Sequence, residues 1–205
     1  MPEDPDNLVK RQLQDWLETF DAETVSVAGI LCDQHAKDPE SIALLYEDAL
    51  GNRARYTFAQ LRDLSSRSAG ALKALGVTKG DRVATLLPKS PELLVTTLGL
   101  WRLGAAHVPL FTAFGPKAIT SRVENSQACV LVTDAANRHK VSFENAGPGS
   151  PQVVTITDEN GDIHDGDVAY LDALAQADPV MDPVLTCGDD LFILIYTSGT
   201  TGSPK

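Results

Sequence analysis

Apolar residues recur along the chain in two patterns, a helical spacing and short continuous runs. The i, i+3, i+4, i+7 spacing of an amphipathic helix occurs near the start, at Leu13, Trp16, Leu17 and Phe20. A second helix is predicted over residues 26–37, before an Asp-Pro stop. The runs 42–46 and 53–57 flank a turn that contains Gly51, and this arrangement predicts two strands joined as a hairpin.

After residue 57, short apolar runs alternate with segments of helical periodicity. Thr57 can cap a helix that stops at Gly76. Strands are predicted at 82–87, 107–110, 129–133, 153–156 and 191–196. Helices are predicted at 91–103, at 116–125 and at 168–177, and a further helix is predicted to follow the strand 129–133 and to end at about Asn145. Strands separated by helices predict an α/β fold, with a parallel sheet covered by helices on both faces. We expect a helical segment over residues 1–40 and an α/β part over residues 41–205.

Composition and charge narrow the class of protein. The 205 residues are 43% hydrophobic, as in a globular protein, and carry a formal charge of −11. That charge argues against a general binder of nucleic acid or of an anionic membrane. Acidic residues dominate segments 1–50 and 151–190, whereas segment 51–150 holds 13 basic and 6 acidic residues. A basic middle could favour a phosphate-bearing ligand; the alternative is a set of solvated faces on separate elements.

The cysteines and the N-terminus indicate the compartment. Cys32, Cys129 and Cys187 are odd in number and widely spaced, so they form neither a disulfide framework nor a metal cluster. The first residues are acidic, unlike a signal peptide, and the most apolar stretch is interrupted by Arg102 and His107. We therefore expect a cytoplasmic protein without a membrane span.

The strongest candidate site is the loop Tyr196-Thr-Ser-Gly-Thr-Thr-Gly-Ser-Pro-Lys205. It follows an apolar strand directly, and its glycines, hydroxyl side chains and lysine are groups that bind anions. Parallel sheets place ligands at the carboxyl ends of their strands. The loop is not the usual nucleotide P-loop, because Gly199 and Gly202 are only three positions apart and Lys205 is not adjacent to the second glycine. The alternative for such a composition is a mobile linker.

This loop resembles the phosphate-loop signature of the adenylate-forming (AMP-binding) enzymes, which include acyl-CoA synthetases, luciferases and peptide-synthetase adenylation domains. Two further stretches are similar to family motifs, Tyr56-Thr-Phe-Ala-Gln-Leu61 and Leu98-Gly-Leu-Trp-Arg-Leu-Gly-Ala-Ala-His-Val-Pro-Leu110. The resemblance runs from about Ser41 to Lys205. The segment 110–119 is more similar to short- and medium-chain acyl-CoA synthetases than to peptide-synthetase domains, while His107 replaces a more common aromatic residue.

The resemblance implies the N-terminal portion of a ligase that uses ATP with Mg²⁺ to activate a carboxylic acid as acyl-AMP, and then transfers the acyl group to coenzyme A. It assigns the β- and γ-phosphates of ATP to the loop residues Thr197, Ser198, Gly199, Thr200, Thr201, Gly202, Ser203 and Lys205. The acyl pocket, the metal-binding glutamate and the catalytic lysine of the family have no counterparts here, so no catalytic residue is named. We expect the 205 residues to be part of a longer protein, inactive alone and prone to self-association.

Two other functions remain open: a non-catalytic truncated relative that binds a nucleotide or a protein partner, and a nucleotide hydrolase with an unusual phosphate loop. Other candidate residues favour structural roles. The acidic segment 158–167 lacks the glycine and glutamate of a calcium loop and is expected to be a solvated turn. Trp101 and Phe111 are expected in the core. None of the histidines has metal-ligand spacing, and His107 is expected to be structural.

Overall fold

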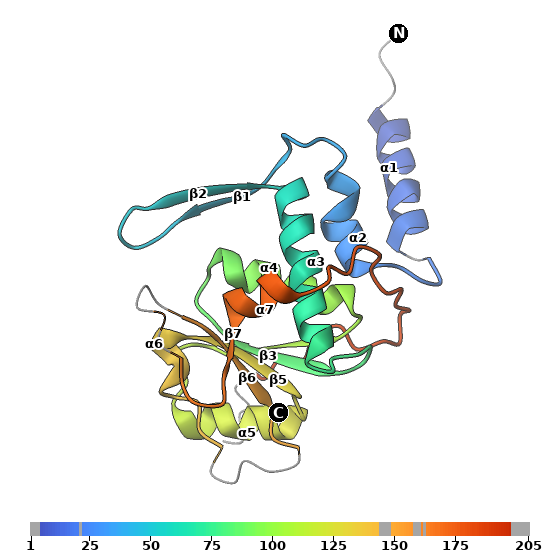
Figure 1. Cartoon of the computed structure of the whole chain (residues 1–205). Helices are drawn as coiled ribbons and strands as arrows, with labels where there is room; N and C mark the ends of the chain where they lie inside the picture. Colours follow the sequence, from blue (N-terminus) through green and yellow to red (C-terminus); the bar gives the residue numbers. More distant parts are fainter. Residues whose placement is uncertain (1–4, 21, 144–148, 158–160, 162, 198–205) are drawn as a thin grey trace.

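A parallel five-stranded sheet lies at the centre of the computed structural model, which describes residues 5–20, 22–143, 149–157, 161 and 163–197. The strand order is β4-β3-β5-β6-β7, and all neighbours in this sheet are parallel. Its strands are β3 (Arg82–Leu86), β4 (Ala106–Pro109), β5 (Val130–Asp134), β6 (Gln152–Ile156) and β7 (Val168–Ala169). The predicted α/β class is confirmed (Figure 1).

Helices cover both faces of this sheet. Helices α3 (Phe58–Ala74), α4 (Pro91–Arg102) and α7 (Tyr170–Gln176) pack on one face, and α5 (Pro116–Ser126) packs on the other. Successive residues of a strand therefore enter different cores: Val130 and Val132 pack under α3 and α4, whereas Leu131 packs against α5. A strand buried on both faces needs no polar alternation, which explains its continuous apolar sequence.

Helix boundaries follow the capping signals in the sequence. The Thr57 hydroxyl accepts the Gln60 amide at 3.2 Å, and the Gln60 side chain accepts the Thr57 amide at 2.8 Å, so the two residues form a capping box at the start of α3. The chain leaves this helix through Gly76, whose φ of +89° suits glycine. Ser90 caps α4, and Pro91 occupies its first turn.

The N-terminal region forms two α-helices, a 3₁₀ helix and a two-stranded hairpin before the sheet. Helix α1 (Pro5–Phe20) exposes its apolar residues Leu13, Trp16 and Leu17. The helix predicted over residues 26–37 is instead divided into α2 (Val27–Leu31) and the 3₁₀ helix η1 (Asp33–His35), because Cys32 has a non-helical φ of −134°. Strands β1 (Ile42–Glu47) and β2 (Arg53–Thr57) form the predicted antiparallel hairpin.

Two predicted helices are shorter than the sequence pattern indicates. Helix α6 (Ala135–Arg138) ends at Arg138, and the described residues that follow, up to 143, are not helical; Asn145 lies outside the described residues. The chain leaves α6 by a turn that brings Val141 into the core beside α5. The helix predicted from residue 168 begins at Tyr170, because Val168 and Ala169 pair with β6.

Candidate functional site

The predicted phosphate loop leaves the sheet at the carboxyl ends of its strands. Ile193 forms a parallel bridge with His107 of β4, so the chain runs in the same direction as the sheet there. The His107 amide donates to the Phe192 carbonyl at 3.1 Å, and the Leu194 amide donates to the His107 carbonyl at 2.8 Å. Tyr196 and Thr197 follow directly. The position matches the prediction, since open α/β sheets bind ligands at this edge.

The segment 191–196 was predicted as an apolar strand, and in the described structure it runs parallel to β4 without forming a continuous strand. It forms one bridge only, and Leu191, Phe192 and Ile195 are exposed. The physical reason is that β4 is its single sheet neighbour among the described residues, so one edge faces solvent. Its apolar contacts come from Leu194 and Tyr196, which pack against the core under α5, and from Phe192, which stacks on Trp101.

The aromatic residues near this segment are only partly in the core. The Trp101 ring stacks on Phe192 with centroids 4.4 Å apart, and its Nε1–H donates to the Phe192 carbonyl at 3.2 Å. Trp101 therefore supports the entry to the loop from α4, in agreement with its predicted packing role. Phe111 was also expected in the core, but it is exposed and touches Phe114 edge-on.

The loop residues themselves fall mostly beyond the described structure. Thr197 is described and exposed. The other predicted phosphate ligands lie outside the described residues: Ser198, Gly199, Thr200, Thr201, Gly202, Ser203 and Lys205. The structure therefore places the start of the signature, and the phosphate-binding role of these residues stays a prediction.

Tyr196, the first residue of the signature, is seated against α5. Its hydroxyl lies 2.7 Å from Asn125 Oδ1 and 3.2 Å from the Arg122 carbonyl oxygen. Partial burial raises the pKa of Tyr196, so the hydroxyl stays protonated near neutral pH and donates a hydrogen bond. Sequence reasoning missed Arg122 and Asn125. The available signal was Arg122 on the apolar side of its helix, between Ile119 and Val123.

His107 lies in β4 directly beside the loop entry. It is buried, and its Nε2 lies 2.8 Å from the Thr85 hydroxyl of β3. Burial lowers the pKa of His107 to about 4, so the imidazole is neutral at pH 7. A buried, neutral histidine that is hydrogen-bonded between strands fits a structural role, and that role stays a prediction.

A polar network closes the carboxyl ends of β5 and β6 on the same edge. Arg138 holds Asp167 with two hydrogen bonds, at 2.6 and 2.9 Å, and Thr155 donates to the same carboxylate at 2.5 Å. Both charged side chains are mostly buried. Asp167 was expected in a solvated turn, and that expectation is wrong for this residue, because the carboxylate anchors the chain to α6.

A second polar arrangement joins the end of β5 to the loop after β4. Asp134 caps α6 by accepting the Asn137 amide at 2.8 Å. Lys140 donates to the Asn137 side chain at 2.8 Å and to the Thr112 carbonyl at 2.7 Å. These contacts fix the segments that border the loop entry.

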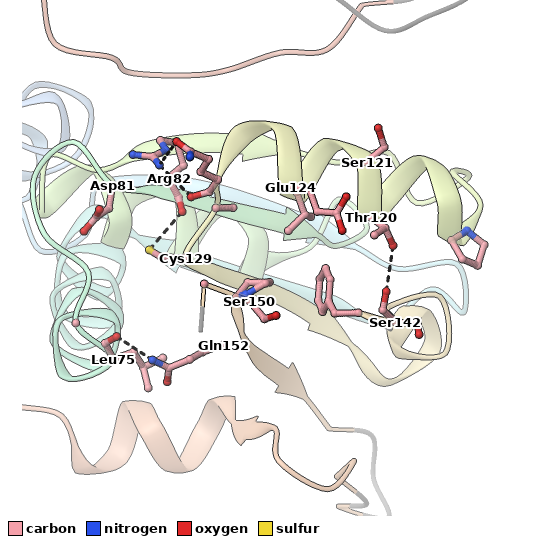
Figure 2. Close-up of a pocket in the computed structure, with 18 of the residues that line it drawn as sticks. Leu75, Asp81, Arg82, Thr120, Ser121, Glu124, Cys129, Ser142, Ser150 and Gln152 are labelled. Atoms are coloured by element: carbon pink, nitrogen blue, oxygen red, sulfur yellow. Dashed lines mark hydrogen bonds between the residues drawn. The ribbon is translucent and has the colours of Figure 1, made fainter. Parts of the chain in front are cut away.

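A large open pocket lies elsewhere among the described residues, along α5 and the amino ends of the strands. It measures about 1080 Å³ and includes Arg82, Cys129 and Gln152, which stand at the starts of β3, β5 and β6 (Figure 2). Arg82 donates to the carbonyls of Gly80, Ser126 and Gln127, so it acts as a structural tie. Because ligands of such sheets bind at the carboxyl edge, we assign the candidate site to the loop entry and not to this cavity.

The described residues offer no cluster of three or more histidine, cysteine or acidic side chains that could hold a metal ion. They also include no helix long and apolar enough to cross a membrane. Cys32, Cys129 and Cys187 are all free thiols.

Comparisons with known proteins identify the family of this chain. The profile of the family described as "AMP-binding enzyme" matches residues 31–205. The chain belongs to this family of adenylate-forming enzymes. It is similar to the N-terminal portion of acyl-CoA synthetases, which confirms the resemblance inferred from the motifs.

Particular relatives carry acyl-CoA synthetase names. The acetyl-coenzyme A synthetase of Pseudoalteromonas translucida is 33% identical over 189 residues, which cover 84% of this chain and 29% of the relative. The human acetyl-coenzyme A synthetase 2-like, mitochondrial protein is 32% identical over 84% of this chain and 27% of its own length. The crystal structure of an acyl-CoA synthetase from Brucella canis matches with a TM-score of 0.85 and 35% identity, over 98% of this chain and 37% of that one. The chain thus spans less than a third of the length of these curated relatives.

Proposed function

We propose that this chain is the phosphate-binding portion of an AMP-forming carboxylic acid–CoA ligase. The observation that carries the proposal is the parallel bridge between Ile193 and His107, which brings Tyr196 and Thr197, the first two residues of the family signature, to the carboxyl edge of the sheet. The names of the relatives indicate an acetyl group and coenzyme A, and the family description indicates AMP. A carboxylic acid and ATP as the other substrates are part of the proposal.

The reaction we propose has two balanced steps. A carboxylate oxygen attacks the α-phosphorus of ATP, and the bond to the bridging oxygen breaks, giving acyl-AMP and pyrophosphate. The coenzyme A thiol then loses its proton and attacks the acyl carbonyl, which releases AMP. The first step needs little covalent help from the protein, so positioning and charge stabilisation carry the rate.

The loop residues have distinct proposed roles. Backbone amides of Gly199 and Gly202 donate to the β- and γ-phosphates, and Lys205 balances the charge of the departing pyrophosphate. The hydroxyl donors are Thr197, Ser198, Thr200, Thr201 and Ser203. ATP brings its own Mg²⁺ in this proposal, and no step uses a metal ligand from the described residues.

The direct test is ATP–pyrophosphate exchange by the product of the complete reading frame, with a panel of short and medium carboxylic acids. We expect exchange with at least one acid, and a loss of at least about tenfold in Lys205→Met. The exposed Lys37→Met is the matched control and should exchange normally. Retained ATP binding without exchange for any acid would contradict the ligase and favour a non-catalytic nucleotide-binding relative.

Two properties of the 205-residue chain accompany this proposal. It should form no acyl-CoA by itself, since it spans only 29% of its relative's length, and measurable formation by the purified chain would overturn that expectation. It should also self-associate through the exposed apolar residues Leu191, Phe192 and Ile195, which light scattering can test. We propose the cytoplasm as its location, because its three thiols are free.

A further inference from the structure

A buried arginine lies beneath the start of the phosphate loop. Arg122, in the middle of α5, is 8% exposed. Its guanidinium carbon lies 4.3 Å from the centroid of the Phe114 ring and 5.6 Å from that of Tyr196. One terminal nitrogen donates to the Ala118 carbonyl at 2.9 Å. The Nε atom is buried and has no hydrogen-bond partner within the described part of the chain.

This arginine is costly as a simple core residue. A buried charge normally requires an ion pair, yet none of the ion pairs among the described residues involves Arg122. Its helix neighbours Ile119 and Val123 fill the same core with apolar side chains. The principal compensation is attraction to two aromatic faces, which is strongest where water is excluded. One of those faces, Tyr196, is the residue from which the phosphate loop begins.

The same helix holds Tyr196 at two points. The ring faces the Arg122 guanidinium, and the hydroxyl donates to Asn125 Oδ1 one helical turn further on. Ring and hydroxyl together fix both the position and the rotation of the tyrosine. The backbone at Thr197 therefore starts from a point set by α5, although the preceding segment 192–194 is attached to the sheet by one bridge only.

We propose that Arg122 is a positioning residue for the phosphate loop. Together with Asn125 it holds Tyr196, and so fixes the point from which the signature begins. Its charge, unpaired by any described carboxylate, also makes the base of the loop more favourable for an anion. The inference rests on the proposed phosphate-binding function of the loop, and it adds a residue outside the signature to that site.

The test measures binding of inorganic pyrophosphate to the complete 205-residue chain by calorimetry. Arg122→Met keeps a side chain of similar length without the charge, and should weaken binding at least about tenfold, equivalent to about 1.4 kcal/mol. Arg122→Lys should recover part of the loss, because it restores the charge but not the planar stack. Arg67→Met is the matched control: Arg67 is an exposed arginine of α3 that pairs with Asp63, and its variant should bind as wild type does. Unchanged affinity in Arg122→Met would overturn the proposal.

A second variant covers the case in which Arg122→Met fails to fold. Asn125 is exposed, so Asn125→Ala should leave the fold intact while removing the acceptor of the Tyr196 hydroxyl. We expect pyrophosphate binding about threefold weaker, as for a lost hydrogen bond of modest strength. Wild-type affinity in this variant would count against a role for the contacts that hold Tyr196 on α5.

A ligand-free measurement separates this inference from the proposed function. The ring resonances of Tyr196, assigned with Tyr196→Phe, should move toward those of a solvent-exposed tyrosine in Arg122→Met and stay in place in Arg67→Met. A wild-type chain that binds no pyrophosphate would contradict the phosphate-binding function, whatever the ring resonances do. Ring resonances that do not move in Arg122→Met would contradict the proposal that Arg122 holds the Tyr196 ring in place.

Discussion

The ion pair between Arg102 and Asp33 provides the sharpest test of what holds the fold together. Arg102, the last residue of α4, is fully buried. Its Nη1 donates to Asp33 Oδ2 at 3.0 Å, its other terminal nitrogen contacts Oδ1, and its Nε donates to the Ser65 hydroxyl at 2.9 Å. It also donates to the Met181 carbonyl at 3.2 Å. One guanidinium thus joins α4 to η1, α3 and the segment that follows α7.

Asp33→Ala should destabilise the protein strongly, because it leaves a buried cation with neutral partners only. Breaking a buried ion pair in this way costs roughly 3–5 kcal/mol. The Asp33 side chain is 21% exposed, so water can partly replace it, and we expect the lower end, about 3 kcal/mol. For a protein of this size that loss lowers the melting temperature by roughly 6–12 °C.

Urea unfolding followed by circular dichroism measures the effect on the free energy of unfolding. The matched control is Asp63→Ala, which breaks the exposed i, i+4 pair with Arg67 and should cost less than about 1 kcal/mol. If Asp33→Ala were no more destabilising than Asp63→Ala, burial of the Arg102 charge would not be a determinant of stability, and the argument would be wrong.

Three further predictions concern packing, pH and thiol reactivity. Gly99→Ala should cost about 2 kcal/mol in thermal unfolding, because the added methyl would lie 2.6 Å from the Ser68 hydroxyl where α4 crosses α3. The pKa of His107 is lowered to about 4 in the folded chain, so the unfolded chain binds more protons between pH 6.5 and 4. The free energy of unfolding should therefore fall by about 3 kcal/mol as the pH drops through this range. In His107→Phe this pH-dependent loss should be absent when urea unfolding is measured at each pH. Cys187 should react with a thiol reagent first, because it is exposed, whereas burial raises the pKa of Cys32 to about 11.

Each of these has a control or an opposing outcome. Gly188→Ala places a methyl in open space and should be nearly neutral; equal losses at Gly99 and Gly188 would contradict the packing argument. The same pH dependence in His107→Phe as in wild type would remove His107 as its cause. Labelling of Cys32 before Cys187 in the folded chain would contradict the burial of that thiol.

The sequence predicted most elements whose signals are local. The capping pair Thr57 and Gln60, the stop at Gly76 and the proline at the start of α4 each depend on residues within one or two turns. The order of strands and helices followed from the apolar runs, and so did the α/β class. The motif also pointed to the carboxyl edge of the sheet, where the bridge of Ile193 to His107 leads into Tyr196, and the phosphate-binding role of the residues that follow stays a prediction.

Features that depend on distant partners could not be predicted in the same way. An arginine in a helix is normally expected to be exposed to solvent. Arg102 is buried because it pairs with Asp33, and this partner lies 69 positions earlier in the chain, where a local pattern does not reveal it. The acidic segment before α7 has the composition of a solvated turn, yet Asp167 is buried by its pairing with Arg138. Strand β7 consists of two residues, and only its neighbour β6 makes it a strand. Each outcome was decided by tertiary contacts, which a local pattern does not contain.

The return segment, residues 177–190, has a consequence for how the protein can vary. After α7 the chain passes back across α3, as Figure 1 shows, and reaches β4, where Ile193 forms a bridge with His107. It is pinned on the way, since the Val180 amide donates to the Ser66 carbonyl at 2.9 Å and the Val184 amide to the Arg102 carbonyl at 2.8 Å. Gly70 provides the clearance, because a side chain there would lie 2.1 Å from the Asp178 carbonyl oxygen.

These two backbone hydrogen bonds hold the return segment in place between the β7 and β4 edges of the sheet. Changes in the length of β7 or of the loop before it are absorbed upstream of the pin at Val180 and leave Tyr196 where it is. One residue added or removed between Val184 and Phe192 would instead have to be accommodated in the turn at 187–190, or it would displace the single bridge between Ile193 and His107. Variation in chain length is therefore less restricted before Val180 than in this short connection to β4.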